Sequence, residues 1–412
     1  MSHREPPLTG VTVLDLTRVM AGPWCTQNLA DLGADVLKIE RPGAGDDTRG
    51  WGPPYVLDGD GRATELSSYF LSANRNKRSV ALDIATPDGA EAVRQLAAQA
   101  DILVENFKFD GLRKYGLDYD SLKALNPRLI YCSITGFGQD GPYAHQPGYD
   151  FVIQAMGGLM SVTGERDALP GGGPQKAGIA TSDLMAGMFA TTSVLGALYE
   201  RERSGKGQYI DISMLDCTVA SLGVQNFNYF LSGEVPRRAG NAHPNLVPYE
   251  VFPVADGHIV LAVGNDSQFR SFCLAAGRPD LAEHPDYRTN SDRVRRRDVL
   301  VPQIAAILRT RPRAEWCALF ERAGVPVGLI NDVAQVHHDP QVLARGIQFR
   351  MPHPVLGELP QVKSPMRLSD SPVRYRIPPP RLGEHTAEVL KERLGYTTEQ
   401  VAALTRPVEK RG

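Results

Sequence analysis

The first third of the chain alternates apolar strand-like runs with helical segments, and this alternation restricts the fold more than any other feature. Residues 11–16 and 35–40 are apolar runs typical of buried strands, and residues 23–32 between them have a helical pattern. The series continues with segments at 79–83, 87–99, 102–106, 119–125 and 129–133. Such a βαβ series predicts an α/β fold with a parallel sheet and helices on its faces.

The pattern changes near residues 236–241, a basic and turn-rich stretch that we interpret as a linker. Beyond it, the apolar runs 249–252 and 259–263 flank Asp256-Gly257, which indicates a hairpin. Helices are expected at 268–276, 294–310 and 313–323. We therefore expect a large Rossmann-like domain over 1–235, a small α+β domain over 245–325, and a segment over 331–412 that completes the large domain.

Composition excludes several classes of protein. A chain of 412 residues with 42% hydrophobic content can bury a large core. Its net charge of -2 provides no electrostatic reason to bind nucleic acid or a membrane surface. The five cysteines are far apart and form no C-x-x-C pair, which argues against a disulfide framework and a zinc site and suits a reducing compartment. With no secretion signal or membrane-spanning run, we expect a cytoplasmic protein.

A ligand site is expected where the parallel strands end, because open α/β sheets bind ligands at the carboxyl edge. These ends fall at 18–20, 41–43, 82–85, 106–108 and 135–137. The first turn lacks G-x-G-x-x-G, so a nicotinamide or flavin dinucleotide is not expected. Cations that could bind a phosphate-bearing ligand lie near these ends: Lys38, Arg41, Arg75, Lys77, Arg78, Lys108 and Lys114. For the loop 74–78, pairing with nearby acids is an equally good interpretation.

One carboxylate, Asp183, lies where a glycine-rich stretch meets an apolar helix expected over 184–200. The preceding residues include the run 169–174 and Gly178. Thr-Ser-Asp before an apolar run is typical of a helix N-cap, and the local pattern alone favours that role. A catalytic role is the alternative.

Ordered motifs over nearly the whole chain resemble family III CoA-transferases (the CaiB/BaiF type). They lie at 14–23, 33–43, 104–107, 205–208 and 382–386. The resemblance implies an interlocked homodimer of Rossmann-like subunits. It also implies a coenzyme A thioester as substrate, a carboxylic acid as second substrate, and no prosthetic group. Segments 45–54, 247–249 and 378–383 resemble the succinate–hydroxymethylglutarate group, which moves CoA from succinyl-CoA to dicarboxylates such as glutarate or hydroxymethylglutarate.

The resemblance also assigns site residues. Asp183 occupies the place of the family's nucleophile, Asp150 that of a supporting carboxylate, and Met20 and Trp51 shape the acyl pocket. CoA contacts are expected at Val19, Met20, Ala21, Arg41, Leu82, Asp83, Ile84, Ala85, Asn106, Phe107, Lys108, Lys114, Tyr149 and Asp150. Three positions depart from other members of the family. Met20 stands where the relatives that use oxalate have Gln, Ala85 stands where relatives have Lys, and Lys114 stands where relatives have Arg. The first departure argues against oxalate as acceptor.

The expected mechanism is attack of an ionised Asp183 on a thioester, giving an aspartyl-CoA thioester. We expect an ordinary carboxyl pKa of about 3.9 at this position, with the helix N-terminus favouring the charged form. The main alternative is an α-methylacyl-CoA racemase of the same fold. Racemases carry His where this chain has Tyr149, and tyrosine is a poor general base at pH 7. A non-catalytic CoA-binding protein is a further alternative.

Overall fold

The computed structural model describes residues 4–405, which divide into two compact units. The first unit contains the residues up to 159, then 177–233, then those from 343 onward; the second contains 160–176 and 234–342. The chain passes between them within α6 (Leu159–Val162) and α16 (Pro340–Arg345), among other places. No helix of the described residues is long and apolar enough to cross a membrane.

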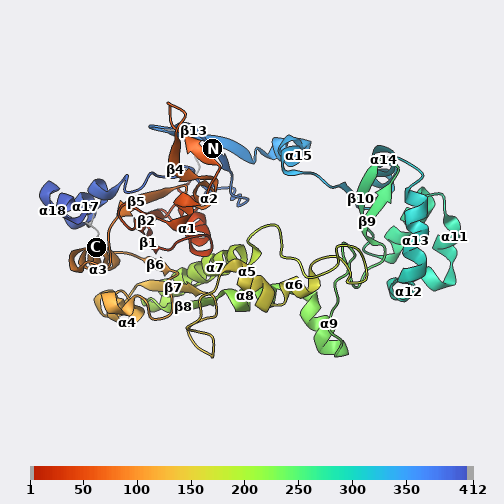
Figure 1. The fold of residues 1–412 in the computed structure, drawn as a ribbon, viewed down its shortest axis with the longest axis horizontal. Helices are drawn as coiled ribbons and strands as arrows, with labels where there is room; N and C mark the ends of the chain where they lie inside the picture. Colours follow the sequence, from red (N-terminus) through yellow and green to blue (C-terminus); the bar gives the residue numbers. More distant parts are fainter. Residues whose placement is uncertain (1–3, 406–412) are drawn as a thin grey trace. The chain divides into compact units, whose positions relative to one another are not determined.

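A parallel sheet of six strands forms the centre of the first unit, as the alternation predicts (Figure 1). Its order is β5-β2-β1-β6-β7-β8, and every neighbouring pair is parallel. In chain order the strands are β1 (Thr12–Leu16), β2 (Asp35–Glu40), β5 (Lys77–Ala81), β6 (Ile102–Glu105), β7 (Ile130–Thr135) and β8 (Tyr209–Ser213). The order grows outward from β1 in both directions, so the direction of winding reverses between β1 and β6.

Alternate residues of each strand enter two different cores, because side chains of a strand point to opposite faces. Val13 packs on the side of α1 (Ala21–Asp31) and α7 (Thr181–Ser204), together with α5 (Asp150–Met156) and α8 (Met214–Ser221). Leu14 packs on the other side, among α3 (Pro87–Ala97), α4 (Tyr119–Leu125), α17 (Thr386–Leu394) and α18 (Thr398–Thr405). The unit is therefore a three-layer α/β/α arrangement, and the C-terminal segment completes one layer.

Smaller elements surround this sheet. They are η1 (Asp47–Gly50), β3 (Tyr55–Leu57), β4 (Ala63–Ser67), α2 (Ser68–Ala73), η2 (Arg113–Tyr115), α9 (Val224–Ser232), β12 (Gln348–His353) and β13 (Gly357–Val362). The pairs β3–β4 and β12–β13 are antiparallel hairpins that the sequence analysis did not predict. Residues 214–232 form two helices and not one, because Gly223 adopts a left-handed φ of 55° between α8 and α9.

The second unit has its own core and a small antiparallel sheet of order β11-β10-β9. Its elements are β9 (Tyr249–Val254), β10 (Gly257–Ala262), α10 (Asp266–Ala275), α11 (Pro279–Glu283), η3 (Pro285–Tyr287), α12 (Asn290–Arg295), α13 (Arg297–Leu308), α14 (Arg313–Arg322), β11 (Val327–Leu329) and α15 (Val333–His338). Arg293 is fully buried here and donates to the carbonyls of Val247 and Tyr287, so it is a structural residue. The independent folding of a 245–325 domain stays a prediction.

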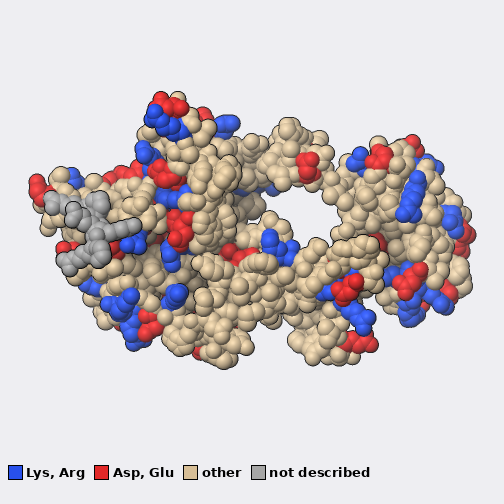
Figure 2. Space-filling model, viewed as in Figure 1, with Lys and Arg blue, Asp and Glu red and all other residues tan. Residues whose placement is uncertain are grey.

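Charged side chains are spread over both units. On the face visible in Figure 2, Lys and Arg alternate with Asp and Glu over the described part of each unit.

Candidate active site

The loops that follow β1 and β6 meet at the point where the winding of the sheet reverses. The side chain of Asn106, just after β6, accepts from the backbone N–H of Arg18 over 2.9 Å and donates to the Arg18 carbonyl over 2.7 Å. This pair of bonds joins the two loops across the crevice in which α/β folds bind ligands. Asn106 thus orders the crevice with its side chain, whatever its contacts with a ligand.

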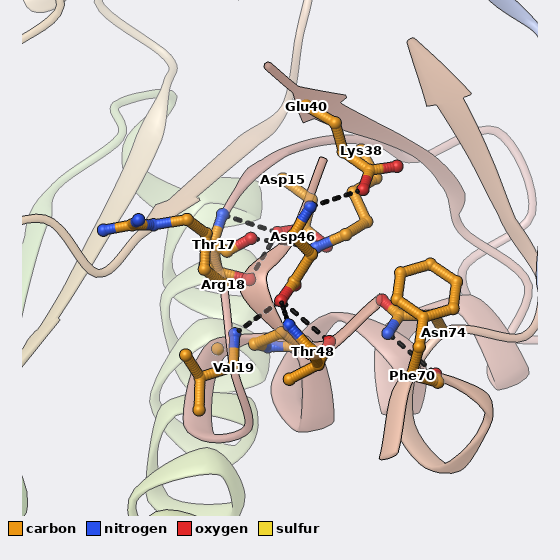
Figure 3. Close-up of polar contacts among 12 residues, drawn as sticks. Asp15, Thr17, Arg18, Val19, Lys38, Glu40, Asp46, Thr48, Phe70 and Asn74 are labelled. Atoms are coloured by element: carbon orange, nitrogen blue, oxygen red, sulfur yellow. Dashed lines mark hydrogen bonds and ion pairs between the residues drawn. The ribbon is translucent and has the colours of Figure 1, made fainter. Parts of the chain in front are cut away.

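The turn after β1 has an unusual backbone. Val19 has a φ of 71°, in the left-handed region that a β-branched residue rarely adopts. Side chains hold the turn in place: Asp46 accepts from the Val19 N–H over 3.2 Å, and Lys38 donates to the Thr17 carbonyl over 2.9 Å (Figure 3). Strained residues of this kind concentrate at functional sites, where the surroundings determine the conformation.

Helix α1 begins directly after this turn and packs closely against α7. A Cβ on Gly187 of α7 would lie only 2.6 Å from the Ala21 carbonyl oxygen, so the contact requires glycine. One helical turn before Gly187, the Asp183 carboxyl faces the backbone N–H of Ala21, which lowers the pKa of the carboxyl. The close packing of α1 on α7 therefore brings a backbone donor to the candidate nucleophile.

Asp183 lies inside the first turn of α7 and does not cap it. The capping carboxylate is Asp150, whose Oδ1 accepts from the backbone N–H groups of Ser182 at 2.8 Å and Asp183 at 3.3 Å. Gln154, one turn further along α5, donates to the other Asp150 oxygen over 2.6 Å and is fully buried. The N-cap interpretation of Asp183 is therefore wrong: α7 starts at Thr181, and its cap comes from another segment.

The pKa of Asp183 is raised to about 7, chiefly by burial and then by the nearby Asp150 carboxylate, against a lowering contribution from the Ala21 N–H. Only 8% of the residue is exposed. The expectation of an ordinary pKa is therefore wrong, because the positive end of the helix is used by Asp150 while Asp183 loses most of its hydration. A carboxylate of this basicity is a better nucleophile than one with a pKa near 4.

Two adjoining cavities run along the crevice. One, of about 140 Å³, is lined by Val19, Ala21, Tyr149 and Asp183 among others, and by Asn106, Phe107 and Lys108 after β6. The other, of about 390 Å³, is lined by Arg41 and by 82–85, the segment after β5. Arg18, Asp47 and Phe107 line both. Together they form a groove, hereafter the crevice groove, and Asp183 lines its smaller cavity.

Most of the residues expected to contact CoA lie along this groove, and their binding role stays a prediction. The residues expected at the site that do not line it are Met20, Trp51, Lys114 and Asp150. Lys114 lies over the ring of Tyr115, which does line it. The sequence analysis missed Asp47 and also Tyr69, whose ring packs edge-on against Trp51 at 5.2 Å. Asp47 lies within the segment 45–54 quoted above, so its place in that segment could have suggested it.

Four of the seven cations near the strand ends are structural. Lys38 and Lys77 are fully buried and pair with Asp46 and Asp15 at 3.0 and 3.1 Å. Arg75 pairs with Asp31 at 2.6 Å, and Arg78 pairs with acids of β2 and α17. The acid-pairing interpretation of the 74–78 loop is therefore correct. The cations that line the crevice groove are Arg18, Arg41 and Lys108.

No group of three or more His, Cys, Asp or Glu side chains in the described chain is arranged to hold a metal ion.

Comparison with known proteins gives a consistent result. The sequence model of CoA-transferase family III matches residues 8–386. The chain is 49% identical to a succinate–glutarate CoA-transferase of Agrobacterium fabrum, over 95% of this chain and 97% of that protein. It is 42% identical to the human succinyl-CoA:glutarate CoA-transferase, over 97% and 88%. A solved CaiB/BaiF family protein of Brucella suis superimposes with a TM-score of 0.81 at 45% identity, covering 95% of this chain and all of that one.

Proposed function

The chain belongs to CoA-transferase family III, and from this premise we propose that it moves CoA from succinyl-CoA to a dicarboxylate, glutarate or hydroxymethylglutarate, through an aspartyl-CoA thioester on Asp183. The family match and the resemblance to succinyl-CoA:glutarate CoA-transferases support the reaction and its substrates. The observation that carries the assignment of the nucleophile is the buried Asp183 carboxyl in the smaller cavity of the crevice groove.

Asp183 suits the role of nucleophile for two reasons. Its pKa of about 7 leaves a large ionised fraction at neutral pH while keeping the carboxylate basic. The Ala21 N–H that faces this carboxyl can also stabilise the oxyanion that forms when the aspartyl carbonyl is attacked.

The proposed reaction has four displacements. An Asp183 oxygen attacks the succinyl carbonyl, the C–S bond breaks, and a succinyl–aspartyl anhydride forms with release of the CoA thiolate. The thiolate attacks the aspartyl carbonyl and expels succinate, leaving the aspartyl-CoA thioester. The acceptor carboxylate attacks the carbonyl of that thioester, releases the thiolate again and forms a second anhydride, between the acceptor and Asp183. The thiolate finally attacks the acceptor's carbonyl, forming the new acyl-CoA and restoring the Asp183 carboxylate.

This sequence requires that water be kept from both anhydrides. The burial of Asp183 in the packed contact between α1 and α7 supports such exclusion. The CoA moiety would extend from Asp183 along the crevice groove, past Phe107, toward the segment 82–85. Arg41 has an exposed side chain in the larger cavity and could pair with a CoA phosphate.

We propose that two chains form a homodimer, interlocked as in the family, and that the protein is cytoplasmic. Helix α9 supports the dimer, because its apolar side chains Phe227, Phe230 and Leu231 are 62–87% exposed in the single chain. Several large apolar side chains exposed on one helix are typical of an interface. Light scattering coupled to size exclusion measures the mass in solution: a dimer is expected, and a monomer would contradict the proposal.

The function is tested by mass spectrometry of the products formed from succinyl-CoA and a panel of carboxylic acids. Glutaryl-CoA or hydroxymethylglutaryl-CoA is expected, and Asp183→Asn should form neither. Transfer only to acids outside the dicarboxylates would refute the substrate assignment. The racemase alternative predicts α-deuterium incorporation from D₂O into a branched acyl-CoA, which a transferase should not catalyse.

A further inference from the structure

The backbone of the turn after β1 is held by side chains at nearly every polar group. Asp15 accepts from the Thr17 N–H at 2.9 Å, and Lys38 donates to the Thr17 carbonyl. Asn106 bonds both backbone groups of Arg18, and Asp46 accepts from the Val19 N–H. A turn that needs only to connect two elements has no need of so many buried partners. Its conformation is therefore specified closely.

Asp46 is the partner best placed to impose the left-handed conformation of Val19. Its Oδ1 accepts from the N–H groups of Val19 and Thr48, at 3.2 and 3.0 Å, while its Oδ2 accepts from the Lys38 ammonium at 3.0 Å (Figure 3). Residue 46 is 1% exposed. The carboxylate is thus fixed from two sides, and a left-handed valine is disfavoured by an amount that a fixed, charged acceptor can offset.

The anchor of Asp46 is itself rigid. The Asp46 N–H donates to Glu40 over 3.0 Å, and Glu40 is held by Arg49 through bonds of 2.7 and 2.8 Å. Both Glu40 and Lys38 belong to β2, which is paired with a neighbouring strand on each side. The position of Val19 is therefore fixed relative to the sheet. Val19 lies two residues before Ala21, whose N–H faces Asp183.

We propose that Asp46, paired with Lys38, is a positioning residue: it holds Val19 in the left-handed conformation and so aims the Ala21 N–H at the Asp183 carboxyl. This inference rests on the proposed role of Asp183 as nucleophile. Asp46 does not line the cavity that contains Asp183, so it acts through the turn.

Asp46→Asn tests the inference, because an amide cannot accept from Lys38 on one side and from two N–H groups on the other. The Ala21 N–H lowers the pKa of Asp183, so its displacement should raise that pKa and move the acid limb of kcat/KM to higher pH. The loss of the negative charge of Asp46 would by itself lower the pKa of Asp183 and move the acid limb to lower pH. The other groups that face Asp183 are Asp150 and Tyr69, and neither is altered. We expect a limb about 0.5–1 pH unit higher and a kcat at least about tenfold lower.

Val19→Pro removes the hydrogen bond from residue 19 to Asp46 and the left-handed conformation, since proline has no N–H and a φ near −65°. It leaves the buried pair of Asp46 and Lys38 intact. Asp31→Asn is the matched control: Asp31 is equally buried and paired with Arg75, but bonds no group of the turn. The acid limb should rise in both test variants and stay in place in the control.

All variants are assayed with the donor and acceptor identified by product analysis. Unshifted limbs in Asp46→Asn and Val19→Pro, or a shift in only one of them when both fold, would overturn the inference. If Asp46→Asn does not fold, Val19→Pro decides alone. Full transfer by Asp183→Asn would instead refute the proposed nucleophile, so the two failures are distinguishable.

Discussion

Replacing Asp183 by Asn should stabilise the protein at pH 8 by more than twice as much as at pH 5. The pKa of Asp183 is about 7 in the folded protein against an ordinary 3.8, so the folded state retains this proton between those values while the unfolded chain has lost it. The free energy of unfolding therefore falls as the pH rises from about 4 to 7. At about 1.4 kcal/mol for each pH unit, the ionised carboxyl costs the folded state about 4 kcal/mol at pH 8.

The neutral amide avoids this cost and can still accept from the Ala21 N–H. We expect a Tm higher than that of the native protein by roughly 5–10 °C at pH 8, and by less than half as much at pH 5. Thermal denaturation followed by circular dichroism at both pH values measures it. An equal Tm difference at pH 5 and pH 8 would refute the raised pKa, and with it the physical basis for Asp183 as a basic, buried nucleophile.

Three further substitutions test other parts of the site. Gly187→Ala places a Cβ 2.6 Å from the Ala21 carbonyl, so α1 must move, and steady-state kinetics should show a kcat at least about tenfold lower; an unchanged kcat would contradict the close-contact argument. Arg41→Ala should raise the KM for acyl-CoA about tenfold, equivalent to about 1.4 kcal/mol, with little change in kcat; the exposed Arg62→Ala is its control, and equal KM values would exclude a role for Arg41 in binding. Asp150→Ala removes the like charge beside Asp183, so the acid limb of the pH–rate profile should move to lower pH. The substitution also removes the cap of α7, so the Tm should fall. An acid limb moved to higher pH would contradict the electrostatic assignment.

The sheet and its ligand edge could be predicted from the sequence because each depends on local patterns. Apolar runs such as 11–16 and 35–40 define strands by themselves, and the rule for parallel sheets then places the loops after them at one edge. The crevice groove lies where that rule puts it, between the loops that begin at Arg18 and Asn106.

The details of the site depend on contacts between distant segments, which no local pattern contains. Lys38 resembles a ligand-binding cation until its partner, Asp46, is seen to be buried with it. The capping role predicted for Asp183 belongs to Asp150, which lies 33 residues earlier in the chain. The same distance explains the pKa of Asp183, because burial by α1 and a neighbouring carboxylate from α5 are tertiary effects.

The central claim, that Asp183 carries the acyl and CoA groups in turn, is tested most directly by trapping. The protein is incubated with succinyl-CoA, treated with hydroxylamine, digested, and analysed by mass spectrometry. We expect a hydroxamate on the peptide that contains Asp183, dependent on succinyl-CoA and absent from Asp183→Asn. An active protein that yields no modification there, or yields it on another carboxylate such as Asp150, would refute Asp183 as the nucleophile.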